Sequence, residues 1–346
     1  MISRKRFLSG ALALTAMTGL MAGIATPLSA EPVKIRIGWV AAPNSWAILF
    51  DAKKDLAKHW GKSYVLELTR FRGTGPQITA LASGVLDIAP LSFSGVAAAV
   101  LNAKLEDLRI IMDEKQDGVP GTYSTEFMVH KDSPIKKVDD LRGKVLATNG
   151  IGGGWDMAMR AMMLRHGMHD QKDYSIIETR LPNMIAMLEQ KKADLVIAPL
   201  PFSARPKFHE IGRTLFTFRD AFGSAIGAAQ LCSRAGFIEK NRAAMVDFAE
   251  DAIRIIRWYW DPANHAEVVK VVSKLSGQKP ENLDSWLFIR GKDNHRDPNG
   301  IPNIEAIQKN IEIQHKLGFL KQTIDVKKYS DVSLVNDALK RIGGKI

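Results

Sequence analysis

The sequence predicts an α/β protein built from two similar lobes, and three observations lead to this prediction. The chain has 346 residues, which is enough for two domains. Apolar strands alternate with helical stretches along most of its length, the pattern of mostly parallel sheets flanked by helices. Two stretches far apart in the chain also read alike, which indicates a repeated structural unit.

The repeated stretches are residues 80–94 and 187–203. Leu81 corresponds to Leu188 and Asp87 to Asp194, an offset of 107 residues in both cases. Each copy contains the end of a helix, a short apolar strand and a loop of small residues, with Ala-Pro-Leu-x-Phe-Ser in common. Matching loops on two lobes that face each other would form a cleft, and clefts between lobes are where small ligands bind.

The elements follow from local patterns. Val33–Trp39 alternates apolar and polar residues, as a half-buried strand does, and a turn at 43–46 precedes an expected helix at 47–60. Thr74 and Pro76 indicate a helix start. Further strands are expected at 64–71, 87–91, 108–112, 127–130, 145–147, 176–179, 194–200 and 225–233. Further helices are expected at 95–103, 155–166, 183–190, 243–260 and 304–317.

The chain is expected to cross between the lobes near residues 122–130 and again near residues 223–233. Residues 31–123 and 231–346 would then form lobe 1, and residues 124–230 would form lobe 2. No low-complexity linker marks either boundary.

Residues 1–30 predict an export signal. Arg4, Lys5 and Arg6 form a charged start, residues 7–21 are apolar, and small residues end the segment. We expect cleavage near Ala30, with Ala25 as the alternative, and the general secretory route because Lys5 interrupts the arginine pair.

The mature chain is expected to be freely soluble in the periplasm. No apolar run in residues 31–346 reaches the roughly 18 residues needed to span a bilayer. Cys232 is the only cysteine, so no internal disulfide is possible, and it lies too far from the signal to carry a lipid anchor.

The chain is basic, with a formal net charge of +11. Loss of the first thirty residues removes three cations and no acid, which leaves +8. A positive field attracts anionic ligands. Nucleic acid is not expected as a partner because the basic residues are scattered.

Loops beyond the carboxyl ends of the strands are the expected ligand site, as in other open α/β sheets. Most of these loops precede a helix, so free N–H groups and the positive end of the helix dipole would face the cleft and suit an anion. The candidate ligand-binding residues are Asn44, Trp46, Arg72, Thr74, Gly75, Ser92, Phe93, Ser94, Gly152, Gly153, Trp155, Pro199 and Pro201.

Several candidates have a structural alternative. Thr74, Ser92 and Ser94 either cap helices or contact the ligand, and a capping hydroxyl can do both. Trp46 and Trp155 either pack against their lobes or line the cleft, and we expect at least one to line it.

The glycine loop, Arg72 and the two repeat aspartates are interpreted from their positions in the chain. Four glycines between Gly150 and Gly154 favour close approach of the backbone to a ligand. Arg72 follows a strand directly and is the preferred side-chain partner for a carboxylate or sulfonate. Asp87 and Asp194 are expected to be structural and to fix strand starts.

Catalytic and metal-binding patterns are weak. Ser133 and Lys136 fit Ser-x-x-Lys, but they lie in a turn and no Lys-Thr-Gly accompanies them. His166 and His169 have no acidic or cysteine ligands that complete a metal set. Cys232 lies in an apolar strand and is expected to pack there. We therefore expect no catalytic residue, no metal and no cofactor.

Three motifs resemble the solute-binding proteins of ABC importers for aliphatic sulfonates, taurine and nitrate. They are Ala80-Leu81-x-Ser83-Gly84-x-x-Asp87 within residues 73–103, the strings 131–135 and 140–144, and the stretch 188–201. The resemblance covers roughly residues 33–275 and implies the fold of a type II periplasmic binding protein. Lys191-Lys192-Ala193 departs from the family's usual glycine before Asp194, and residues 286–302 match nothing in it.

The resulting hypothesis is a monomeric periplasmic protein that closes two lobes on a small organic anion and delivers it to an inner-membrane ABC permease. The aromatic candidates favour an aromatic or bulky carboxylate or sulfonate over nitrate. An enzyme related to the pyrimidine-synthesis proteins of the same fold, and a partner that presents its ligand to a membrane sensor, are the alternatives.

Overall fold

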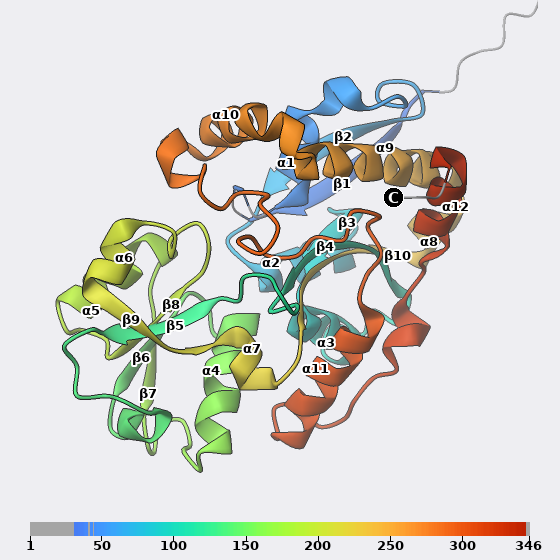
Figure 1. Cartoon of the computed structure of the whole chain (residues 1–346). Coiled ribbons are helices and arrows are strands. Elements are labelled where there is room, and N and C mark those ends of the chain that lie inside the picture. The colour runs from blue at the N-terminus through green and yellow to red at the C-terminus, as the bar shows by residue number, and fades with distance from the viewer. Residues whose placement is uncertain (1–30, 41, 44, 344–346) are drawn as a thin grey trace, which may run out of the picture. The chain divides into compact units, whose positions relative to one another are not determined.

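Two five-stranded sheets with the same internal order form the framework (Figure 1). The computed structural model describes residues 31–40, 42–43 and 45–343, so the predicted export signal, its cleavage positions and Asn44 lie outside the described residues. The strand order is β2-β1-β3-β10-β4 in one sheet and β7-β6-β8-β5-β9 in the other. The α/β prediction, with two mixed sheets flanked by helices, is confirmed.

In each sheet, three parallel strands are followed by two strands that run antiparallel to their neighbours. The strands are β1 (Val33–Trp39), β2 (Tyr64–Arg70), β3 (Ile88–Leu91), β4 (Leu108–Asp117), β5 (Glu126–His130), β6 (Val145–Thr148), β7 (Ser175–Glu178), β8 (Leu195–Ala198), β9 (Gly212–Thr217) and β10 (Ile226–Arg234). The helices are α1 (Trp46–Ala52), α2 (Thr74–Ala82), α3 (Phe93–Leu101), α4 (Gly154–Arg165), α5 (Met184–Glu189), α6 (Pro206–Ile211), α7 (Phe218–Phe222), α8 (Ala235–Lys240), α9 (Arg242–Trp260), α10 (His265–Ser276), α11 (Ile304–Lys316) and α12 (Ser333–Ile342).

The aspartates of the sequence repeat have the same structural task in both sheets, as predicted. The Asp87 N–H donates to the Arg36 carbonyl on β1, and the Asp87 carboxylate accepts the Arg36 N–H in return. Asp194 makes the same reciprocal pair with Val145 on β6. Each aspartate therefore joins the start of its strand to the parallel neighbour, which explains why the residue recurs at this position.

Several elements differ from the sequence prediction. The helix expected at 47–60 ends at Ala52, because the buried Asp251 carboxylate on α9 accepts the N–H groups of Lys58 and His59 and holds that segment out of a helix. The strand β4 continues to Asp117 instead of ending at residue 112, because its polar second half pairs with β10. The strand β9 was not predicted.

Helices cover both faces of the first sheet. The helices α1, α9 and α12 pack on one face, and α2, α3 and α11 pack on the other. The chain passes from the first sheet to the second through residues 118–125 and returns through residues 218–225 (Figure 1). The predicted lobe boundaries, 31–123 with 231–346 and 124–230, stay a prediction.

Candidate functional site

The N-terminal ends of three helices meet where the two sheets are joined. A Cβ placed on Gly95 of α3 would lie 2.5 Å from the Thr74 Cγ2 of α2, so these two helix starts are in contact. A Cβ on Gly154 of α4 would lie 3.6 Å from the Phe93 ring and 3.9 Å from the Ser92 Cβ. The starts of α2, α3 and α4 therefore come together, and the α3 start is the loop of the first repeat.

The ring of Phe93 is buried between these helices rather than exposed to a hollow. Its centroid lies 5.2 Å from that of Phe222 on α7, in an edge-to-face arrangement. Phe218 lies 5.9 Å from Phe222 and also faces Gly154. These aromatic rings belong to one apolar cluster that includes residues of both sheets.

The predicted hydroxyl residues divide between capping and other roles. Ser92 caps α3, because its Oγ accepts the Gly95 N–H at 3.2 Å. The Ser94 hydroxyl lies 2.9 Å from that of Ser92. The N-cap of α2 is Gly73, so Thr74 is the first residue of that helix instead of its cap.

Arg72 and Gly75 are exposed beside this region. Among the described residues, no hydrogen bond or ion pair holds the Arg72 guanidinium. The side chain is therefore available to an anion, and its role in binding stays a prediction.

Part of the glycine loop before α4 already has internal acceptors. The Ile151 N–H donates to Glu178 at 2.6 Å, and the Gly152 N–H donates to the buried Asp156 at 2.8 Å. Burial raises the pKa of Asp156, which Arg160 pairs at 3.0 Å. Gly153 is the N-cap, and the first turn of α4 that follows it is the part of the loop left to receive an anion.

Trp46 lies in the core of the first sheet. Its ring packs edge-on against Phe50 and Tyr259, and its backbone N–H donates to Glu114 at 2.6 Å. The start of α1 therefore already carries a carboxylate from the chain itself. Pro199 and Pro201 are buried, and Leu200 between them packs in the same apolar cluster as Trp46.

Trp155 lies beside the first connection between the sheets. Its Nε1 donates to the Thr125 hydroxyl at 3.3 Å, and the Lys115 Nζ of β4 lies 6.0 Å from the centre of its ring. The indole N–H of Trp155 is thus paired with another element, whereas that of Trp46 has no hydrogen-bond partner among the described residues.

A buried carboxylate fixes this connection. Asp117 accepts hydrogen bonds from the Ser124 hydroxyl at 2.7 Å, from the Thr125 hydroxyl at 2.6 Å and from the Asn294 amide at 3.1 Å. Burial raises the pKa of Asp117, and the hydrogen bonds from Ser124 and Thr125 offset only part of this rise. The first connection between the sheets is therefore fixed by hydrogen bonds, which depend on the distances and directions of their groups.

Residues 289–302, which we term the strap, run along β4 and complete the joint. The Gln116 N–H donates to the His295 carbonyl and the Asp113 N–H to the Gly300 carbonyl, each at 2.8 Å. The strap brings Asp293 and Arg296 into the interior, paired at 3.1 Å. It is the part of the chain that the sequence patterns could not assign.

The sequence reasoning missed Glu114, Lys115, Thr125 and Arg296. A signal was present, because Asp113-Glu114-Lys115 follows the apolar run 110–112 directly in one strand. Charged residues are rare in a strand that is covered on both faces unless they have polar partners. Here they lie where β4 leads into the connection between the two sheets.

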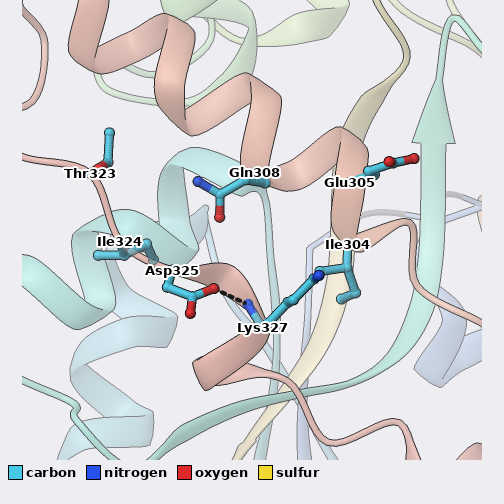
Figure 2. A pocket seen from close by; sticks show the side chains of 7 residues that line it. All are labelled: Ile304, Glu305, Gln308, Thr323, Ile324, Asp325 and Lys327. Atoms are coloured by element: carbon cyan, nitrogen blue, oxygen red, sulfur yellow. Dashed lines mark hydrogen bonds between the residues drawn. The ribbon is translucent and has the colours of Figure 1, made fainter.

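A hollow of about 800 Å³ lies elsewhere, between α11 and residues 323–327 (Figure 2). Gln308 reaches from α11 toward this segment and accepts the Val326 N–H at 2.9 Å. Asp325 accepts the Lys327 N–H within the same turn. The hollow contains none of the predicted site residues, and most of its lining is exposed.

The groups considered for catalysis have structural roles. Cys232 is fully buried in β10, and burial raises the pKa of its thiol, which disfavours a thiolate nucleophile. The Ser133 hydroxyl accepts the Ile135 N–H within a turn. In the described part of the chain, no three histidine, cysteine or acidic side chains come together as a metal site.

Comparison with known proteins now places the chain. The model of the NMT1-like family matches residues 28–273, which is more than half of the sequence. The chain belongs to the NMT1-like family. A search of curated proteins finds no match.

Solved structures share the fold at low identity. The aliphatic sulphonate binding protein SsuA from Escherichia coli is 16% identical, with a TM-score of 0.64 over 86% of this chain and 92% of that one. The nitrate-binding protein NrtA from Synechocystis PCC 6803 is 15% identical, with a TM-score of 0.69 over 90% and 89%. The resemblance inferred from the motifs is thereby confirmed at the level of family and fold.

An enzyme also shares this fold. The desulfurization enzyme DszB is 12% identical, with a TM-score of 0.61 over 90% of this chain and 99% of that one. Fold alone therefore does not decide between binding and catalysis, and the site has to do so.

Proposed function

We propose that this protein is the periplasmic solute-binding component of an ABC importer and captures a small organic anion, a sulfonate or an aromatic carboxylate. The two sheet units would close on the solute and open to release it, as two-lobed binding proteins do. The observation that carries the proposal is the contact between the starts of α3 and α4, which come from the two different sheets.

An anion suits this place for electrostatic reasons. The first turn of a helix presents N–H groups and the positive end of the helix dipole. Thr74, Ser92 and Gly153 mark three such turns, and Arg72 and Lys115 add two cations without carboxylate partners in the described part of the chain. The net positive charge of the chain attracts the same class of solute.

Binding without chemistry is favoured over the enzyme alternative. The chain's single thiol is buried, with a raised pKa, and is far from being an accessible nucleophile. The hydroxyls of Ser92 and Ser94 bond to each other and to a helix start, with no base beside them in the described residues. The structural neighbours that bind sulfonate and nitrate support the same choice.

Export and delivery complete the proposal. Residues 1–30 would direct the chain to the periplasm and be removed near Ala30. None of the described helices has both the length and the apolar character needed to cross a bilayer. The partner would be an inner-membrane ABC permease, and the protein would act as a monomer; presentation of the ligand to a membrane sensor is the second role that the same site supports.

A thermal-shift panel tests the proposal. The purified mature protein is heated with methanesulfonate, taurine, benzenesulfonate, benzoate and nitrate, each against a chloride control. A ligand at 100 times its dissociation constant should add about 2.7 kcal/mol to the free energy of unfolding. The absence of stabilisation by any of these compounds would contradict the anion assignment, and turnover of a bound compound would contradict a binding role.

A further inference from the structure

We propose that Lys115 receives the acid group of the ligand, with the Trp155 ring beside it. This inference rests on the proposed function and names a residue for it that the sequence patterns did not select. It places part of the binding site on β4, the strand that leads from the first sheet to the second.

Position is the first argument. Lys115 belongs to the polar end of β4, and its Nζ lies 6.0 Å from the centre of the Trp155 ring. Trp155 is the second residue of α4, so the ring beside the ammonium group is carried by the helix whose start faces Ser92 and Phe93. The side chain keeps some access to solvent, as a ligand-binding group requires.

The second argument is that Lys115 has no carboxylate partner among the described residues, while its acidic neighbours are committed elsewhere. The Glu114 carboxylate accepts the Trp46 N–H. Asp117 is held by Ser124, Thr125 and Asn294. An ammonium group that is largely removed from water is stabilised by a nearby anion, and a bound solute can be that anion.

A second cation strengthens the local field. Arg296 on the strap is only 2% exposed, and its Nη1 pairs with Asp293. Its Nη2 has no hydrogen-bond partner within the described part of the chain. Burial and the nearby Arg296 lower the pKa of Lys115, while Asp117, Glu114 and Asp293 raise it. An anion placed beside Lys115 reduces the repulsion between the two cations.

The burial of Lys115, together with the nearby Arg296, predicts a specific pH dependence of binding. Because the free protein holds the Lys115 pKa below its usual value, the ammonium is lost earlier than normal as the pH rises. Affinity for the anion should therefore fall as the pH rises through that pKa. Arginine stays charged throughout this range, so Lys115→Arg should bind with little alkaline loss.

The test is isothermal titration of methanesulfonate, benzenesulfonate and benzoate into the mature wild type and three variants. Lys115→Met should weaken binding of any anion that the wild type binds by about 10- to 100-fold. Lys115→Arg should retain most of the affinity and flatten the pH profile. The control Lys309→Met changes an exposed lysine on α11 and should bind within about twofold of the wild type.

The outcomes separate the two proposals. If the wild type binds one of these anions and Lys115→Met binds it equally well, the role of Lys115 is wrong and the proposed function stands. If Lys115→Met fails to fold, Lys115→Arg with an unchanged alkaline loss of affinity would also overturn that role. If the wild type binds none of the anions, both proposals fall.

Discussion

The contact between the starts of α2 and α3 predicts that Gly95→Ala lowers the free energy of unfolding when residue 74 is threonine and raises it when residue 74 is alanine. A Cβ on Gly95 would lie 2.5 Å from the Thr74 Cγ2 and 3.4 Å from the Leu91 Cβ. Alanine in a helix is favoured over glycine by about 0.5–1 kcal/mol. Overpacking of this severity costs about 1–3 kcal/mol, so Gly95→Ala should destabilise the protein by roughly 0.5–2 kcal/mol.

Removal of the obstructing methyl group should reverse this result. In a Thr74→Ala background, Gly95→Ala should stabilise the protein by about 0.5–1 kcal/mol, because only the helix preference remains. The Gly95 N–H that Ser92 accepts is kept in both backgrounds, so the cap is not a variable. Gly75→Ala is the control, because no atom of the described residues lies within 4 Å of a Cβ at that position.

Urea unfolding of the four proteins of this cycle measures the coupling directly. We expect a coupling free energy of about 1–3 kcal/mol between positions 74 and 95. Stabilisation by Gly95→Ala in the wild-type background, or a coupling below about 0.5 kcal/mol, would show that the two helix starts are not in contact.

Three further predictions concern polar groups in or next to the strands. Burial raises the pKa of Asp113 to about 8, so the stability that the protonated carboxyl contributes is lost as the pH rises from about 4 to about 8. Across that window, the free energy of unfolding of Asp113→Asn should rise relative to that of the wild type by on the order of 5 kcal/mol in urea titrations. Parallel pH profiles of the two proteins would contradict this. Asp87→Ala should cost about 3 kcal/mol and Asp194→Ala about 1 kcal/mol, since the Arg36 guanidinium and N–H give Asp87 three bonds; equal losses would argue against this account. The Cys232 thiol should react with a thiol reagent only after unfolding, and rapid labelling of the native protein would refute its burial.

The framework could be predicted because its signals are local. The alternation in Val33–Trp39 and the repeat that contains Asp87 and Asp194 depend on neighbouring residues in the chain and on one parallel partner strand. Helix starts at Thr74 and Ser92 were found within a residue for the same reason.

The elements that were missed depend on distant partners. The N–H groups that stop the first helix are held by Asp251, almost two hundred residues away. The polar end of β4 is a strand because β10 and the strap cover it, and neither is visible in the local pattern.

The candidate site was predicted at the level of loops but not of side chains. The sequence located the helix starts that meet, yet it could not show that Trp46 is enclosed by Phe50 and Tyr259. It also gave no weight to Lys115, because a lysine in a polar stretch is ordinary until the strand places it beside Trp155.

The central claim is that an organic anion binds where the starts of α3 and α4 meet. The most direct measurement is a crystal structure of the mature protein grown with 4-bromobenzenesulfonate, with the bromine located from its anomalous signal. We predict an intact compound whose sulfonate lies beside Ser92 and Gly154, with the bromine peak one benzene ring away from that sulfonate. A peak in the hollow of α11 and residues 323–327 instead, or a cleaved compound at the predicted place, would contradict the account.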